Sequence, residues 1–336
     1  MLPDHPLISY LDGREVAYSV VGSGPPLVMC GWWAHNLALD WQDQLFRSFV
    51  APFAESHAVV RYDRASAVRP QLGDEAALIA RLVTRLRSGP ATIVGIGSGA
   101  MVAAAVAARH PEFVDRLVLY GSFCSGAELT PPANLDAARV LVGAHWEVAS
   151  RVIAEVMLAE ATPSERAEYA RRQRRAHTKA RALAELDAVA GWDATSDLGR
   201  VHAPTLVIHR RQDRVVAIAL GQRVAASIEG ASFVPLDGTE HLPWRGESDE
   251  VVRAALGFLG VRLHRRSQAE PGAAHLSVRE ADVLRLVARG MTDTQIAGEL
   301  ILSAHTVHRH VANARLKLGV SSRAAAAAWA AHNGLF

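Results

Sequence analysis

Short hydrophobic runs alternate with helical stretches along most of the chain. Each run is four or five residues long, which is typical of buried strands. The five runs cover residues 27–30, 58–62, 92–95, 116–120 and 205–209. Ahead of them, residues 7–10 and 15–21 flank Asp12-Gly13, a pair suited to a tight hairpin turn. The alternation predicts an α/β fold, in which a largely parallel sheet carries helices on both faces.

Between residues 124 and 198 the pattern changes to one helix after another. Thr162-Pro163-Ser164-Glu165 is a capping box with proline at the first helical position, and it predicts a helix that runs toward Val189. An all-helical insertion between two strands predicts a cap over the carboxyl edge of the sheet. Basic residues gather on this helix, and we interpret them as a solvated face because no aromatic residues interleave with them. They are Arg171, Arg172, Arg174, Arg175, Lys179 and Arg181.

The end of the chain has a third pattern. Residues 262–271 are polar and unpatterned, so we interpret them as a linker between a large domain over residues 1–261 and a small domain over residues 272–336. The small domain contains clear signals for the start and the end of helices. These are Ser277-x-x-Glu280, Thr292-x-x-Gln295, Ser303, Ser321, Gly290 and Gly319. They predict four short helices around one small core.

Composition narrows the class of protein. Half of the 336 residues are hydrophobic and 21% are charged, as in globular proteins. The longest apolar run, residues 100–108, is far shorter than the roughly 20 residues of a membrane span, and no signal segment is recognisable. The two cysteines, Cys30 and Cys124, have no metal-binding spacing. We therefore expect a cytoplasmic protein that does not enter a membrane and has no metal or cofactor.

Charge is distributed unevenly along the chain. Residues 1–261 carry 26 lysines and arginines against 29 acidic residues, whereas residues 262–336 carry 10 against 5. A basic end points toward nucleic acid, although so small a surplus would also suit an ordinary solvated surface.

The small domain carries a dense set of spaced motifs. They are Leu276-Ser277-x-Arg279-Glu280, Gly290-Met291-Thr292, Ile296-Ala297-x-x-Leu300, Ser303-x-x-Thr306-Val307-x-x-His310 and Lys317-Leu318-Gly319-Val320. With these motifs, residues 276–331 resemble the LuxR/FixJ type of helix-turn-helix domain. The resemblance implies that the helix from Ser303 to about Lys317 enters the major groove of double-stranded DNA.

The resemblance also implies which residues lie at the DNA. They are Ser303, His305, Thr306, His308, Arg309, Asn313, Lys317 and Arg323. Arg309 is expected to read a base, because a guanidinium can bind guanine O6 and N7 together. Lys317 and Arg323 suit phosphates, which position a protein without specifying sequence. Two alternatives stay open: Thr306 could only cap the helix, and Arg323 could pair with a carboxylate such as Glu280.

The large domain carries a second set of motifs. They are Gly31-Trp32-Trp33, Arg61-Tyr62-Asp63-Arg64, Gly95-Ile96-Gly97-Ser98-Gly99, Ala203-Pro204-Thr205, Asp213-Arg214-Val215-Val216 and Gly238-Thr239-Glu240-His241. With these motifs, residues 7–260 resemble the α/β-hydrolase fold. An active member needs a serine at the centre of G-x-S-x-G, on a sharp turn between strand and helix. Aligning Gly95 and Gly99 with the outer glycines leaves Gly97 at the nucleophile position. A frame shifted to Ser98, the alternative nucleophile, puts side chains at the tight positions.

The other two positions of a catalytic triad are kept. Asp213 follows a strand, as the orienting acid should, and His241 follows a loop, as the general base should. As an alternative, Asp213 could pair with Arg214 or Arg211. Without an activated hydroxyl, efficient ester hydrolysis is not expected. The turn at residues 65–67, Ala-Ser-Ala, also departs from the glycine-rich turn of the family.

Two functions from different classes fit these observations. The first is a DNA-binding transcription regulator whose hydrolase-like domain senses a small, mostly apolar ligand or forms a homodimer. The expected ligand pocket consists of Trp32, Trp33, Gly97, Ser98 and His241. The alternative is an active, esterase-like hydrolase that carries a DNA-targeting module, and Gly97 argues against it. A phosphorylated receiver domain is disfavoured, because the only lysine outside the small domain, Lys179, lies on a cap helix. An interaction scaffold without a ligand stays open.

Overall fold

The computed structural model describes residues 7–11, 14–64, 70–261, 276, 278–300, 302 and 304–335. The chain divides into two compact units, Met1–Arg262 and Leu263–Phe336. Several predicted features lie outside the described residues, namely the Asp12-Gly13 turn, residues 65–67, the linker at 262–271, Ser277 and Ser303. No helix of the described residues is long and apolar enough to cross a membrane.

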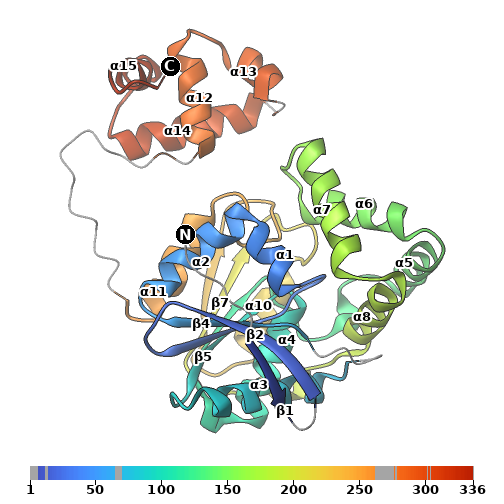
Figure 1. The fold of residues 1–336 in the computed structure, drawn as a ribbon. Coiled ribbons are helices and arrows are strands. Elements are labelled where there is room, and N and C mark those ends of the chain that lie inside the picture. Colours follow the sequence, from blue (N-terminus) through green and yellow to red (C-terminus); the bar gives the residue numbers. More distant parts are fainter. Residues whose placement is uncertain are drawn as a thin grey trace. The chain divides into compact units, whose positions relative to one another are not determined.

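The first unit is built on an eight-stranded sheet (Figure 1). In chain order its strands are β1 (Leu7–Leu11), β2 (Arg14–Val21), β3 (Pro26–Cys30), β4 (Ala58–Tyr62), β5 (Ala91–Ile96), β6 (Val114–Tyr120), β7 (Thr205–Arg210) and β8 (Ser232–Leu236). Their order in the sheet is β1-β2-β4-β3-β5-β6-β7-β8. The β1–β2 and β2–β4 pairs are antiparallel, and the other pairs are parallel. The pattern does not predict β8, which is mostly half-buried and contains Pro235, an uncommon residue inside strands.

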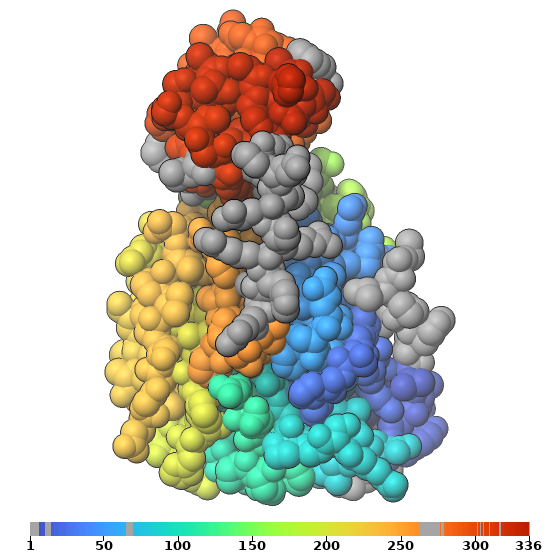
Figure 2. All heavy atoms as spheres, turned by 90° about the vertical axis from the view of Figure 1, so that its left-hand side faces the viewer, coloured from blue at the N-terminus to red at the C-terminus, as the bar shows by residue number. Residues whose placement is uncertain are grey.

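Helices cover both faces of the sheet. On one face, α3 (Leu72–Leu86), α4 (Ser98–Arg109) and α10 (Ile218–Ala226) contribute to one apolar cluster. On the other face, α2 (Gln44–Ala54) and α11 (Ser248–Phe258) lie side by side and share a second cluster (Figure 2). The α4 helix is buried over residues 99–108 and is rich in alanine, which allows it to lie close to the sheet. The predicted α/β architecture is confirmed.

Helices also form the insertion between β6 and β7, shown in green in Figure 1. They are α5 (Pro132–Ala144), α6 (Trp146–Met157), α7 (Pro163–Ala176), α8 (Lys179–Gly191) and α9 (Thr195–Leu198). The capping box of Thr162 and Glu165 is present at the start of α7. The single helix predicted to reach Val189 is wrong, because α7 ends at Ala176 and the next residue, His177, is extended. Thr178 then starts α8, and its side chain accepts a hydrogen bond from the Arg181 backbone N–H.

The second unit contains four helices among its described residues. They are α12 (Val278–Ala288), α13 (Asp293–Leu300), α14 (Ala304–Leu318) and α15 (Arg323–His332). Their apolar faces meet in one core, with Val283, Ile296 and Val307 fully buried. The Thr292–Gln295 capping box is present, and Gly290 and Gly319 have positive φ angles of 82° and 66°. The predicted N-cap at Ser321 is wrong by one residue, because Ser322 accepts the hydrogen bond from Ala325.

Candidate functional site

A sharp turn between β5 and α4 carries the site. Gly97 forms this turn with φ 55° and ψ −120°. A Cβ atom built at Gly95 would lie 2.5 Å from the Cα atom of Ala100, and one at Gly99 would lie 2.6 Å from the carbonyl oxygen of Gly31. Both outer positions therefore require glycine. A Cβ at Gly97 would instead lie 3.0 Å from His241 Nε2, so the central position of the turn faces the histidine.

Ser98 does not occupy that central position. It is the first residue of α4, and its hydroxyl lies 3.4 Å from a guanidinium nitrogen of Arg64. The backbone N–H of Ser98 is in the first turn of the helix, where N–H groups have no intrahelical acceptor.

Asp213 and His241 form a buried dyad beside Gly97. His241 Nδ1 lies 2.8 Å from Asp213 Oδ2, while Asp213 Oδ1 accepts hydrogen bonds from the N–H groups of Val215 and Val216. Burial alone would raise the pKa of Asp213, but the His241 ring and these N–H groups outweigh it and lower the pKa. An ionised carboxylate only accepts, so Nδ1 donates to Asp213, and Nε2 is the ring nitrogen on the side of Gly97.

The alternative pairing of Asp213 with a neighbouring arginine is wrong. Asp213 faces His241, and Arg211 forms its ion pair with Asp237 at the surface, with 3.4 Å between the charged atoms.

An apolar cavity of about 210 Å³ opens in front of the dyad. Its walls come from the carboxyl ends of β3, β5, β6 and β7 and from the cap helices α6 and α8. The structure brings together all five residues expected at the pocket, Trp32, Trp33, Gly97, Ser98 and His241. The residues that sequence reasoning missed are Phe123, Leu129, Ile153, Met157, Leu186, Val189, Val215 and Val216. Most of these apolar residues belong to the cap or to loops, and no local motif marks them.

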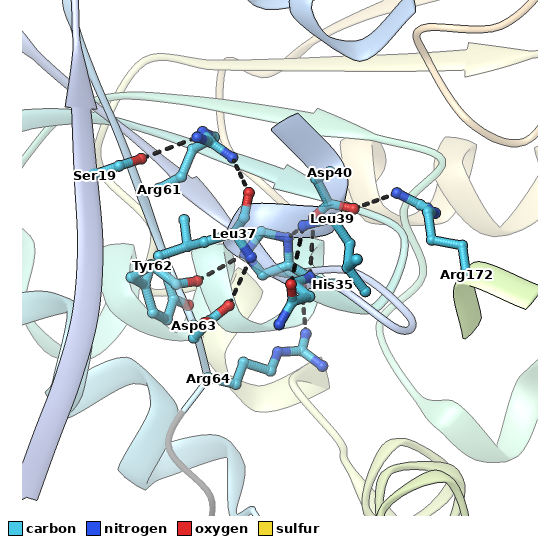
Figure 3. Close-up of polar contacts among 12 residues, drawn as sticks. Ser19, His35, Leu37, Leu39, Asp40, Arg61, Tyr62, Asp63, Arg64 and Arg172 are labelled. Carbon is cyan, nitrogen blue, oxygen red and sulfur yellow. Dashed lines mark hydrogen bonds and ion pairs between the residues drawn. The ribbon is translucent and has the colours of Figure 1, made fainter. Parts of the chain in front are cut away.

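A buried polar network holds the loop that carries the two tryptophans (Figure 3). His35 Nε2 lies 2.8 Å from the carbonyl oxygen of Tyr62, and Nδ1 lies 2.5 Å from Asp40 Oδ2. The other oxygen of Asp40 pairs with Arg172 of α7. Burial opposes ionisation of Asp40, but His35 and Arg172 outweigh burial and lower its pKa. Near Asp40, Arg61 donates to the carbonyl oxygen of Leu37, within the short helix α1 (Leu37–Gln42). The network therefore joins the loop after β3 to the cap.

The solvated-face interpretation of the basic run is therefore wrong for Arg172, which is only 8% exposed. It holds for Arg171, which is exposed and pairs with Glu168 on the surface of the same helix.

Arg64 makes a second connection between the cap and the body of the unit. One guanidinium nitrogen lies 2.7 Å from Glu185 Oε1 of α8, and another donates to the carbonyl oxygen of Gly31. The carboxylate of Glu75, on α3, forms an ion pair with the same guanidinium, with 3.8 Å between Oε2 and Arg64 Nε. Burial raises the pKa of Glu75 more than Arg64 lowers it. Sequence reasoning missed this cluster, because its members are far apart in the chain.

Trp33 links the cavity itself to the cap. Its indole N–H donates to Gln173 Oε1 at 2.9 Å, and the amide nitrogen of Gln173 donates to the carbonyl oxygen of Ser150, also at 2.9 Å. Trp33 therefore lines the cavity and hydrogen-bonds to α7, which in turn contacts α6.

In the second unit, several residues expected at DNA have partners within the unit. Lys317 Nζ lies 2.8 Å from Glu280 Oε2, and Arg323 lies 2.5 Å from Asp293 Oδ1. Arg323 thus pairs with a carboxylate, as the alternative suggested, but that carboxylate is Asp293, and Glu280 pairs with Lys317 instead. His308 is exposed and lies 3.4 Å from Asp293.

The remaining residues expected at DNA lie in or beside α14. Thr306 and Asn313 are half-buried on this helix. His305 and Arg309 belong to α14, but their side chains are outside the described part of the chain, and so is Ser303. The expected role of Arg309 stays a prediction.

Two family models match the chain, one in each unit. Residues 65–248 match the model described as serine aminopeptidase, S33, and residues 274–330 match bacterial regulatory proteins of the luxR family. The first match covers more than half of the chain.

Relatives of known description are similar to one unit or the other. A probable transcriptional regulatory protein NarL from Mycobacterium tuberculosis is 42% identical over 80 residues, which are 24% of this chain and 36% of the relative. The chain thus spans about a third of that relative's length. A pimeloyl-[acyl-carrier protein] methyl ester esterase from Chromobacterium violaceum is 26% identical over 250 residues, covering 70% of this chain and 94% of the relative.

The fold of the first unit is shared with solved hydrolases. The crystal structure of a hydrolase from Pseudomonas aeruginosa superposes with a TM-score of 0.66 at 23% identity, covering 76% of this chain and 98% of that one. At this identity the likeness shows the fold alone.

Proposed function

The chain belongs to the serine aminopeptidase S33 family and ends in a luxR-family helix-turn-helix domain, and from this premise we propose that it is a DNA-binding transcription regulator. In this proposal, the hydrolase-like unit has lost its nucleophile and binds a small, mostly apolar molecule that changes DNA binding. Gly97 carries the proposal, because it faces His241 Nε2 at the position where an active member needs serine.

The apolar cavity supports a binding role for the first unit. In open α/β sheets, ligands bind at the carboxyl ends of the strands, and the cavity lies there beneath α6 and α8. Its wall residue Trp33 hydrogen-bonds to Gln173 of α7, so a molecule in the cavity contacts a residue that also holds the cap. A ligand can regulate only if it favours one arrangement of the chain over another. In this proposal, the ligand favours the arrangement in which Trp33 holds Gln173 of the cap.

The luxR-family domain supports DNA as the partner. Its α14 corresponds to the helix that enters the major groove in helix-turn-helix proteins. The surplus of basic residues after residue 261 suits a phosphate backbone. A regulator of this kind works in the cytoplasm, and homodimerisation would match a two-fold symmetric operator.

DNA titration of the full-length protein tests the proposal. Genomic fragments from the protein's own host are titrated across a salt series, with and without lipophilic metabolites that stabilise the protein in a thermal-shift screen. We expect preference for some fragments, weaker binding at high salt, and a change of about 5- to 150-fold with an effective ligand. Trp33→Ala should remove the ligand's effect. Equal binding to all fragments, or a stabilising ligand that leaves DNA affinity unchanged, would contradict the proposal.

The retained dyad favours one alternative, an esterase-like enzyme that carries a DNA-targeting module. Asp213 and His241 keep the contact that a general base needs, 2.8 Å between Oδ2 and Nδ1. Short-chain aryl esters distinguish the two functions on the same preparation. Turnover that disappears in His241→Ala or Ser98→Ala would establish the enzyme, and its absence in the wild-type protein would support the regulator.

A further inference from the structure

We propose that a second, polar cavity between the cap and the body of the first unit binds a small uncharged polyol. The walls of this cavity come from the loops after β3 and β4 and from the junction of α7 and α8. The inference goes beyond the proposed function, because the polar cavity is separate from the apolar one in front of Gly97. Trp32 is the wall residue that the two cavities share.

The first polar group in the wall is the indole N–H of Trp32. This residue is only 2% exposed, and its Nε1 has no hydrogen-bond partner among the described residues. An indole nitrogen can only donate, and a buried donor without an acceptor costs free energy. Because Trp32 lines the cavity, an oxygen of a molecule bound there would supply the acceptor.

The second polar group is a ring nitrogen of His177, which directly follows α7. Its Nε2 lies 3.2 Å from Glu185 Oε2, and Glu185 also pairs with Arg64. Burial lowers the pKa of His177 more than Glu185 raises it, so the ring is neutral and carries its proton on the nitrogen that faces this carboxylate. Nδ1 is therefore an acceptor. It has no hydrogen-bond partner in the part of the chain that the structure describes, and the residue is 5% exposed.

Two half-buried side chains of the wall add a further donor and a further acceptor. Asn36 accepts from the N–H of Leu39 through Oδ1, which leaves its amide NH2 group to donate. Asp63 accepts from the N–H of Leu37 through Oδ1, which leaves Oδ2 to accept (Figure 3). The wall thus contains both donors and acceptors. Each hydroxyl of a polyol can donate and accept, so a polyol suits both kinds of group.

The charge and the size of the cavity favour an uncharged molecule of five or six carbons. The wall contains two acidic side chains, Asp63 and Glu185, and two basic ones, Arg64 and Arg181. These charges balance, so the wall favours neither an anion nor a cation. The volume of about 280 Å³ equals roughly nine water-sized groups at about 30 Å³ each. Bonded atoms pack more closely than separate waters, so a polyol of this length has a suitable size.

Four probes test the inference on the full-length protein by calorimetry. Three share a six-carbon ring: myo-inositol has a hydroxyl on every carbon and no charge, quinate adds a carboxylate to a hydroxylated ring, and cyclohexanol has a single hydroxyl. Xylitol is an open-chain polyol of a different shape. We expect myo-inositol or xylitol to bind at least tenfold more tightly than quinate and cyclohexanol. Binding of neither polyol, or binding of quinate or cyclohexanol as tight as that of the better polyol, would overturn the inference.

A pair of variants on α7 places the polyol in this cavity. Ala176 is half-buried in the wall at the end of the helix, so Ala176→Phe should fill the cavity and abolish polyol binding. Ala167→Phe is the matched control, because it adds the same ring to the same helix at an exposed position outside the wall. Unchanged polyol affinity in Ala176→Phe would place binding elsewhere and overturn the inference.

A second pair tests the donor without adding bulk. Trp32→Phe removes the indole N–H and keeps an aromatic ring, so polyol affinity should fall at least fivefold. Trp244 is also 2% exposed with an unpartnered Nε1, but it does not line the cavity, so Trp244→Phe should leave the affinity unchanged. Equal affinities in the two variants would overturn the inference. None of these measurements involves DNA or the apolar cavity, so their failure would leave the proposed function as it stands.

Discussion

At the scale of single residues, ion pairs within the unit determine whether a basic side chain is available to contact DNA. The resemblance to LuxR-type domains implies that Lys317 and Arg323 contact DNA phosphates. In the structure, both side chains form ion pairs with carboxylates of their own unit. Glu280, the partner of Lys317, is fully buried on α12 and 37 residues away in sequence. The Lys317 contact therefore joins α14 to α12. This makes Lys317 a stabilising residue as well as a candidate for DNA contact.

Lys317→Met should destabilise the second unit by about 1–3 kcal/mol, because it removes a charged hydrogen bond from a buried carboxylate. Lys317→Arg, which keeps the charge, should cost less than half as much. Chemical denaturation followed by circular dichroism measures both. Unchanged stability in Lys317→Met, together with a uniform loss of affinity for all DNA sequences, would show that phosphate contact is the residue's main role.

At the scale of elements, the cap helix α7 is attached to the body by a few buried polar contacts. Arg172 enters the interface, pairs with the fully buried Asp40 and lies over the ring of Tyr169 at 5.0 Å. The neighbouring Arg171 points to solvent, where its ion pair with Glu168 is exposed on both sides. Adjacent arginines on one helix thus have opposite environments.

Arg172→Met should destabilise the first unit by about 3–5 kcal/mol, because it breaks a buried pair and leaves the Asp40 carboxylate without its arginine partner. Arg171→Met is the matched control and should cost less than about 1 kcal/mol, as exposed ion pairs do. Urea denaturation gives both values, and limited proteolysis shows whether cleavage begins in residues 124–198. Similar losses in the two variants would mean that the Asp40 contact does not hold the cap.

At the scale of the whole molecule, the two compact units have separate apolar cores. Units with separate cores unfold as separate cooperative transitions when few contacts join them. We therefore expect two transitions in differential scanning calorimetry of the full chain. Lys317→Met should lower only one of them and Arg172→Met only the other. A single transition shifted by both variants would show that the units unfold together.

The sequence predicts those strands, helices and turns that depend on residues close together in the chain. Strand periodicity, the capping boxes at Thr162 and Thr292 and the spacing of Gly95, Gly97 and Gly99 all lie within a few residues, and they predict seven of the eight strands, two helix starts and the β5–α4 turn. The contacts that hold the cap are not local: Arg64 and Glu185 are 121 residues apart, and Arg172 and Asp40 are 132 apart. No pattern along the chain indicates such pairs, because only the tertiary fold brings them together. Thr178, by contrast, is an ordinary N-cap residue and could have marked the break between α7 and α8.

The backbone at Gly97 bears on what a serine would cost at this turn. Its φ of 55° lies in a region that glycine adopts freely, whereas a residue with a side chain pays roughly 1–3 kcal/mol for similar strained conformations. Compared with serine at this turn, glycine removes the hydroxyl and relaxes the backbone in one step. Backbone strain thus disfavours serine at this turn, whereas the larger conformational entropy that glycine loses on folding acts in the opposite direction. A serine at this turn would therefore need the surrounding structure to hold it in a strained conformation.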